Sequence, residues 1–152
     1  MFERILVPVD GSPTCHNAVV KAVGLSKAFS SAVTILYVID PYPFTGVGAD
    51  FAYGQAEYLS AALAEAHSAV HAAKELFEAE GIAPGTSVVE AHTVWRGIVE
   101  AAESSHADLI VMGSHGRHGL GKLVLGSVAH SVLSHTNLPV LVVRDPGARH
   151  KK

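Results

Sequence analysis

A glycine-rich stretch over residues 108–127, DLIVMGSHGRHGLGKLVLGS, holds the residues whose types and spacing could do chemistry. It opens with an apolar run, Leu109–Met112, and a helical pattern begins at Ser127. Glycine lets backbone N–H groups come close to an anion, and a helix N-terminus carries partial positive charge. A strand, a glycine-rich loop and a helix N-terminus in this order bind phosphate. The stretch therefore predicts a nucleotide-binding site.

Three glycine-loop patterns can be compared with this stretch. A dinucleotide fingerprint follows the first strand of its domain, but the first predicted strand here leads into Asp10-Gly11-Ser12-Pro13. Gly116–Lys122 is similar to a P-loop, but Leu123 stands where a hydroxyl would hold Mg²⁺. A third pattern, Gly-x2-Gly-x9-Gly-Ser, fits without a gap and is formed by Gly113, Gly116, Gly126 and Ser127.

Composition narrows the class of protein. The chain has 152 residues, of which 49% are hydrophobic and 16% charged, which suits one globular domain. A formal net charge of −3 argues against nucleic-acid binding by bulk electrostatics. The single cysteine, Cys15, excludes an intrachain disulfide and fits a reducing compartment. No apolar run reaches membrane-spanning length and the N-terminus is unlike a secretion signal, so we expect a cytoplasmic protein without membrane partners.

Hydrophobic periodicity predicts strands that alternate with helices. The predicted strands are Arg4–Val9, Ala32–Ile39, Thr86–Val94, Asp108–Met112 and Pro139–Val143. The predicted helices run from Pro13 to about Phe29 and over Glu57–Glu80, Gly97–His106 and Ser127–His135, with a long loop over Asp40–Gln55. This alternation predicts an α/β fold: a single domain over residues 1–145 with an open parallel five-stranded sheet, helices on both faces, and a polar tail over 146–152.

Two strand ends of this predicted sheet are polar and rich in turn residues. Asp10-Gly11-Ser12 follows the first strand, and Gly113-Ser114-His115 follows the fourth. Open parallel sheets bind ligands at the carboxyl ends of their strands, beside the switch in strand order. We expect both segments to face one crevice.

With these motifs the chain resembles the nucleotide-binding branch of the universal stress protein family over nearly its whole length. The resemblance is carried by ILVPVDGS, DLIVMGSHGRHGL, VLGSVAHSVL and LPVLVV, together with the long middle helix. It implies a Rossmann-like fold of the adenine nucleotide alpha hydrolase-like kind. The cofactor it implies is ATP, or AMP or ADP, with Mg²⁺ or Mn²⁺ as an optional companion.

The resemblance also implies which residues bind the nucleotide. Asp10 would contact the adenine side, and Val38 would present backbone groups and apolar surface to adenine. Gly116 and Arg117 would approach the phosphates. The whole implied set is Pro8, Val9, Asp10, Val38, Met112, Gly113, Gly116, Arg117, Gly126, Ser127 and Val128.

The sequence leaves more than one function open. No Ser-His-Asp arrangement or paired carboxylates stand out, which favours a nucleotide-dependent stress-response or signalling module over an enzyme. A slow ATPase or autophosphorylating enzyme, and a nucleotide-free interaction module, remain alternatives. The last strand with Leu138, residues 138–143, would be a long apolar edge, so a homodimer through it is expected, as in similar family members.

Several side chains have a plain structural interpretation beside a functional one. His67 and His71 are spaced to chelate a metal, but a solvated helix face is the favoured interpretation. Cys15 lies near a helix N-terminus, where its pKa could be lowered, but a small buried residue is favoured. Ser127 could be an N-cap, a phosphate ligand, or both.

Overall fold

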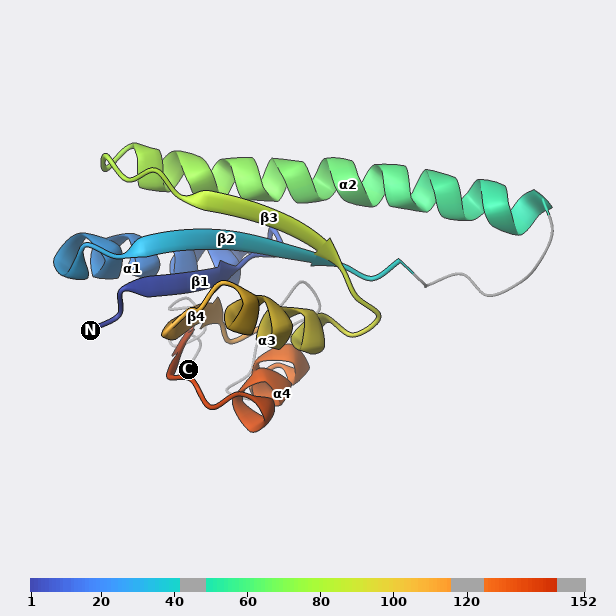
Figure 1. The fold of residues 1–152 in the computed structure, drawn as a ribbon. Coiled ribbons are helices and arrows are strands. Elements are labelled where there is room, and N and C mark those ends of the chain that lie inside the picture. Colours follow the sequence, from blue (N-terminus) through green and yellow to red (C-terminus); the bar gives the residue numbers. More distant parts are fainter. Residues whose placement is uncertain (42–48, 116–124, 145–152) are drawn as a thin grey trace, which may run out of the picture.

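A computed structural model of the chain describes residues 1–41, 49–115 and 125–144, and only the backbone of residues 49–53. Strands and helices alternate along the chain (Figure 1). The strands are β1 (Arg4–Pro8), β2 (Ala32–Ile39), β3 (Gly85–Glu90), β4 (Leu109–Gly113) and β5 (Val140–Val143). The helices are α1 (Pro13–Phe29), α2 (Ala49–Glu78), α3 (Val94–Ser104) and α4 (Ser127–His135).

The five strands form one parallel sheet in the order β3-β2-β1-β4-β5. This confirms the predicted fold class. The strand order reverses at β1, because β2 and β3 lie on one side of it and β4 and β5 on the other. A switch of this kind opens a crevice at the carboxyl ends of β1 and β4.

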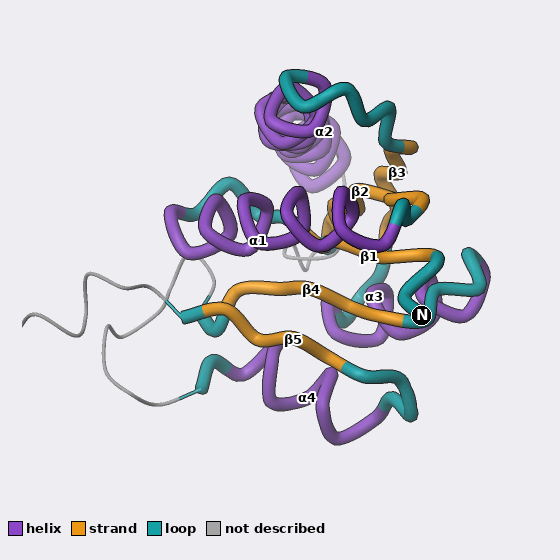
Figure 2. Tube along the Cα trace, turned by 90° about the vertical axis from the view of Figure 1, so that its left-hand side faces the viewer, coloured by secondary structure: helices purple, strands orange, loops and turns teal. Residues whose placement is uncertain are grey.

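Helices cover both faces of the sheet (Figure 2). On one face α1 and α2 pack against the strands, with Phe77, Ile35 and Val7 among the fully buried side chains. On the other face α3 and α4 pack around Leu6 and Ile110. The strands are therefore apolar on both sides, as expected for a parallel sheet between two helical layers. Within the described ranges, no helix is long and apolar enough to cross a membrane.

Local sequence signals set the start of α1, which lies near the crevice, and the end of α2, which lies at the opposite end of the sheet. The hydroxyl of Ser12 accepts a hydrogen bond from Cys15 N at 3.2 Å, and Pro13 occupies the first turn of α1. Gly81 has a φ of +79°, and Ile82 N donates to Phe77 O beyond the end of α2. This is a Schellman-type stop, for which glycine is the usual residue.

Three predicted boundaries were wrong: the start of the long helix, the end of the third strand and the start of the helix after it. The long helix begins at Ala49, so residues 49–55 are helical and are not part of a loop over Asp40–Gln55. The good helix formers at positions 49, 52, 55 and 56 outweigh Gly54, which costs about 1 kcal/mol in a helix. The third strand ends at Glu90, where its pairing with Ile39 ends, and α3 begins at Val94 despite the β-branched residues there.

Candidate nucleotide-binding site

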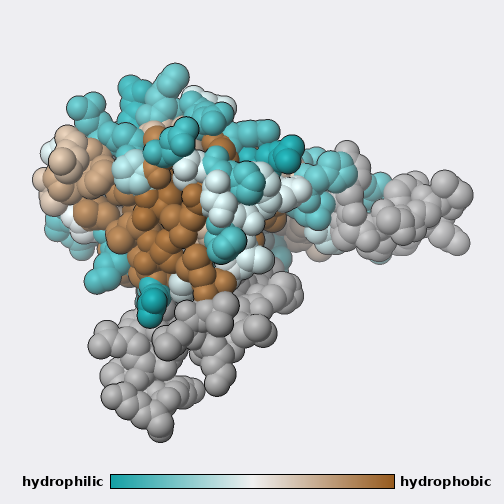
Figure 3. Space-filling model, turned by 90° about the horizontal axis from the view of Figure 1, so that it is seen from below, coloured by the Kyte–Doolittle hydropathy of each residue, from teal (hydrophilic) through white to brown (hydrophobic). Residues whose placement is uncertain are grey.

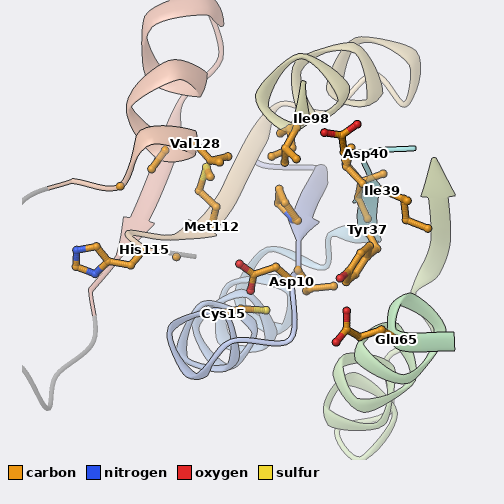
Figure 4. Close-up of a pocket in the computed structure, with 18 of the residues that line it drawn as sticks. Asp10, Cys15, Tyr37, Ile39, Asp40, Glu65, Ile98, Met112, His115 and Val128 are labelled. Atoms are coloured by element: carbon orange, nitrogen blue, oxygen red, sulfur yellow. The ribbon is translucent and has the colours of Figure 1, made fainter. Parts of the chain in front are cut away.

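A cavity of about 550 Å³ lies at the carboxyl ends of β1, β2 and β4 (Figure 4). Its size is within the usual range for small-molecule sites. The ends of β1, β2 and β4 form its centre, and α2 stands on one side of them with α3 and α4 on the other. The lining residues include Pro8, Val9, Asp10, Cys15, Val38, Asp40, Tyr58, Glu65, Ile98, Met112, Gly113, Ser114, His115, Gly126, Ser127 and Val128.

The structure brings most of the sequence-predicted residues together in this cavity. Those that line it are Pro8, Val9, Asp10, Val38, Met112, Gly113, Gly126, Ser127 and Val128. They come from separate parts of the chain and meet because parallel strands share one carboxyl edge. Gly116 and Arg117 lie outside the described residues.

The turn after β1 holds Asp10 in place at the cavity. Oδ1 of Asp10 accepts a hydrogen bond from Ser12 N at 2.9 Å. The intervening Gly11 has a φ of +81°, which a residue with a side chain adopts only at a cost. Asp10 therefore has the turn role weighed from the sequence and also lines the cavity. A carboxylate held this way still has lone pairs for hydroxyl or amino donors.

The start of α4 forms the opposite side of the cavity. Gly126 is the N-cap residue, and among the described residues no side chain caps the helix. The first helical bond runs from His130 N to Gly126 O at 2.9 Å. The N–H groups of the three preceding residues, which line the cavity, lie before that bond. They are donors at the positive end of a helix, where an anion is favoured.

A close backbone contact joins the end of β4 to the start of α4. Gly126 N donates to Ser114 O at 2.7 Å, and Ser114 N donates to Val143 O at 2.9 Å. A Cβ at position 126 would stand 2.7 Å from Ser114 O, so only glycine fits without a shift. The two ends of the glycine motif are thus pinned to each other and to β5.

The cavity has an apolar wall on the side of α3. Val38, Ile98 and Met112 line it. Gly97 lets α3 approach β2 closely, because a Cβ there would lie 2.9 Å from Val38 Cγ1. An apolar wall suits a heterocyclic base better than a phosphate.

Charged side chains are unevenly distributed around the cavity. Asp10, Asp40 and Glu65 lie toward β1, β2 and α2, whereas His115 lies on the β4 side (Figure 4). Acidic groups repel phosphate and accept hydrogen bonds from amino and hydroxyl groups. The cavity is therefore suited to hydroxyl and amino groups at its acidic end and to an anion at the start of α4.

The sequence-based interpretation missed one wall, which α2 contributes. Tyr58, Ala61, Ala62 and Glu65 line the cavity. The hydroxyl of Tyr58 also donates to Asp40 O at 2.9 Å, which ties the helix to the end of β2. These positions repeat at helical spacing, so they share one face. The spacing was visible in the sequence, but not that this face meets the strand ends.

Cys15 is buried at the base of the cavity. Burial raises the pKa of its thiol, and the carboxylate of Asp10 adds to the rise against the lowering by the Asp10 and Gly11 backbone hydrogen bonds. The small buried residue favoured from the sequence is confirmed, and the alternative of a lowered pKa is not supported.

The histidines of α2 lie on an exposed face. His71 Nε2 lies 3.2 Å from Glu75 Oε2, and both side chains are largely exposed. In the part of the chain that the structure describes, no three histidine, cysteine or acidic side chains are grouped to hold a metal ion. The His67 and His71 spacing therefore gains no third ligand there.

Comparison with known proteins identifies the family. The sequence profile described as "Universal stress protein family" matches residues 1–144. The chain belongs to the universal stress protein family. Universal stress protein MJ0531 of Methanocaldococcus jannaschii is 37% identical over 147 residues, which cover 96% of this chain and 84% of that protein.

Solved structures of this family have the same fold. The structure of MJ0577, published as a hypothetical protein in a test of function assignment, superposes with a TM-score of 0.82 at 30% identity, covering 95% of this chain and 97% of the other. A universal stress protein in complex with cAMP superposes with a TM-score of 0.61 at 26% identity, covering 94% and 97%. The family and its fold are thus shown for this chain.

Proposed function

We propose that this universal stress protein binds an adenine nucleotide, with ATP as the first candidate and AMP or ADP as others, in the cavity at the strand ends. The observation that carries the proposal is the start of α4. First-turn N–H groups that precede the first helical hydrogen bond, a glycine N-cap and the turn after β4 line one side of the cavity. Such a site binds anions through backbone donors.

The residues around the cavity fit a nucleotide in one orientation. The phosphates would lie on the N–H groups of Ser127 and Val128, with Gly126 giving them room. The base would pack on the apolar wall of Val38 and Met112. The ribose would lie between, where Asp10 can accept its hydroxyl hydrogens. The cAMP complex of a family member supports an adenine nucleotide as the ligand class.

We further propose that the protein acts as a cytoplasmic, nucleotide-dependent stress-response module and works as a homodimer. The second part rests on β5, an edge strand of the sheet. Its Leu141 is 39% exposed, and Leu133 of the neighbouring α4 is 44% exposed. In Figure 2, β5 is the lowest strand of the sheet. Figure 3 shows the molecule from below and reveals an apolar area on this side. Pairing two β5 edges would cover it.

A titration of ATP by calorimetry tests the binding proposal on three proteins: wild type, Gly126→Ala and Gly24→Ala. Gly126→Ala should weaken binding at least tenfold, because the new Cβ would meet Ser114 O and push the phosphate turn apart. Gly24→Ala is the matched control, since a Cβ at this α1 position meets nothing within 4 Å. Its affinity should equal that of the wild type.

The binding of the wild type and of Gly126→Ala can each contradict the proposal. If the wild type bound no ATP, AMP or ADP, nucleotide binding would be wrong. If Gly126→Ala bound as tightly as the wild type, the ligand would have to lie away from the start of α4. The comparison of the two glycines separates a local effect from a general effect of the substitution.

A further inference from the structure

The side chain of Ser114 is buried without a hydrogen-bond partner. The residue is 4% exposed, and within the described ranges nothing pairs with its Oγ. Leaving a buried hydroxyl unpaired costs about 1–3 kcal/mol. The hydroxyls of two other buried serines are satisfied, because Ser12 accepts from Cys15 N and Ser26 donates to Val23 O. The unpaired hydroxyl of Ser114 is therefore unusual among the buried serines that the structure describes.

Strand register places the Ser114 side chain on the face of the sheet that α4 covers. Ile110 N donates to Pro139 O, and Ser114 N donates to Val143 O. The N–H groups of both residues therefore point toward β5, and their side chains lie on the same face of the sheet. Side chains alternate along a strand, so Ser114 continues the row of Ile110 and Met112. That row packs against α3 and α4, whereas the intervening Gly113 lies against Thr14 of α1.

Two hydrogen bonds hold the backbone of Ser114 in place. Its N–H is bonded to β5 and its carbonyl to Gly126 N. The residue is thus held beside the first turn of α4, and it lines the cavity. A hydroxyl at this place adds a side-chain donor to the backbone donors of the helix.

We infer that the Ser114 hydroxyl donates a hydrogen bond to the phosphate of the bound nucleotide, which is the partner it lacks in the protein alone. The inference rests on the proposed nucleotide binding and assigns a ligand role to a variable position of the glycine motif, between Gly113 and Gly116. The cost of the unpaired hydroxyl is then borne by the free protein and recovered on binding. Ser114 belongs to the binding machinery; its segment, Gly113-Ser114-His115, was expected to face the crevice, but Ser114 was not among the predicted ligand residues.

Ser114→Ala tests this through two quantities expected to move in opposite directions. The affinity for ATP should fall about tenfold, since a hydrogen bond to a charged group is lost. The melting temperature of the ligand-free protein should stay unchanged or rise by about 2–4 °C, since an unpaired buried hydroxyl is removed. Ser134→Ala is the matched control on α4, because the exposed Ser134 hydroxyl donates to His130 O away from the cavity. It should leave the affinity unchanged.

Titration with 2′-deoxy-ATP and 3′-deoxy-ATP separates phosphate from ribose contact. The loss caused by Ser114→Ala should be the same for both analogues as for ATP. An affinity unchanged in Ser114→Ala would overturn the inference, and so would a loss that disappears with a deoxy analogue. A ligand-free Ser114→Ala protein that melts several degrees lower would show that the hydroxyl has an internal partner, which also overturns it. A wild type that binds none of the nucleotides would instead overturn the proposed function.

Discussion

At the residue scale, steric contacts explain why glycine stands at two positions of the motif, whether or not a ligand is bound. A Cβ at Gly113 would lie 2.9 Å from Thr14 Cγ2 and 3.2 Å from the Thr14 carbonyl oxygen. A Cβ at Gly126 would lie 2.7 Å from Ser114 O. Both positions allow elements to meet closely at the cavity, which is where the spacing of the glycines predicted a site.

Residues whose place at the cavity depends on burial and on the packing of distant elements were harder to predict. Asp10 was found from the sequence because it directly follows a strand in a turn motif. Ser114 was expected at the crevice but was not named as a ligand, because nothing in the residue type shows that its hydroxyl is buried and, among the described residues, unpaired. Glu65 and Tyr58 were missed because their role depends on how α2 packs across the strand ends. Local chemistry is visible in the sequence, whereas burial and long-range packing are not.

Asp108 carries a pH-dependent part of the stability, at the end of the sheet opposite the cavity. Its carboxylate accepts hydrogen bonds from Glu3 N at 2.8 Å and Arg4 N at 3.0 Å. Desolvation raises its pKa, but these backbone donors outweigh that effect, so the pKa lies below its ordinary value. A lowered pKa means that the stabilisation is present above the unfolded-state pKa of about 3.9 and is lost as the pH falls through the folded-state pKa.

We predict that Asp108→Ala lowers the free energy of unfolding by about 1 kcal/mol at pH 7, because two backbone donors lose their acceptor. The difference from the wild type should begin to shrink as the pH falls below the unfolded-state pKa of about 3.9, and it should keep shrinking as the pH approaches the lowered folded-state pKa. Urea unfolding at pH 7, 5 and 3 measures this. An equal difference at all three values would mean that the charge of Asp108 is irrelevant. ATP affinity at pH 7 should not change, since the residue lies far from the site.

At the element scale, α2 is the helix that the sequence described least well. Its second half packs on the sheet through Ala66, Val70, Ala73 and Phe77, and it lies within the helix that hydrophobic periodicity predicted over Glu57–Glu80. Its first turns were interpreted as a loop, because glycine and aromatic residues are frequent there. The helix continues to Ala49, and its side chains bond to the end of β2. Tertiary contacts support these turns in addition to helix propensity.

We predict that Tyr58→Phe loosens the first turns of α2 while the rest of the helix stays protected. The hydrogen bond to Asp40 O is lost, which should cost about 1 kcal/mol locally. Amide hydrogen exchange, followed by mass spectrometry on peptides covering residues 49–60 and 66–78, separates the two halves. Faster exchange confined to the first peptide is expected. Equal acceleration in both would show that Tyr58 supports the fold as a whole.

At the scale of the whole molecule, the topology brings the site together. The order β3-β2-β1-β4-β5 sets the ends of β1, β2 and β4 side by side, and helices on both faces supply the walls. The alternation of strands and helices predicted this architecture, because right-handed crossovers leave few topologies open. Helix and strand ends were less predictable, since pairing partners decide where β3 stops and α3 begins.

The exposed edge of the sheet leads to a prediction about assembly. Leu141→Lys should convert the proposed dimer to a monomer, because a charge on the edge strand opposes pairing with a second copy. Sedimentation equilibrium of the wild type and the variant measures this. Val20→Lys is a control with a similarly exposed apolar side chain on α1, at 49% against 39%. A monomeric wild type, or a dimeric Leu141→Lys, would contradict a dimer through β5.

A crystal structure of the wild type grown with ATP tests the central claim most directly. We predict that the triphosphate lies against the N–H groups of Ser127 and Val128, within hydrogen-bond distance of Ser114 Oγ. The base should lie on the wall formed by Val38 and Met112. A nucleotide bound elsewhere, or one whose phosphates point toward Asp40 and Glu65, would contradict this account of the site.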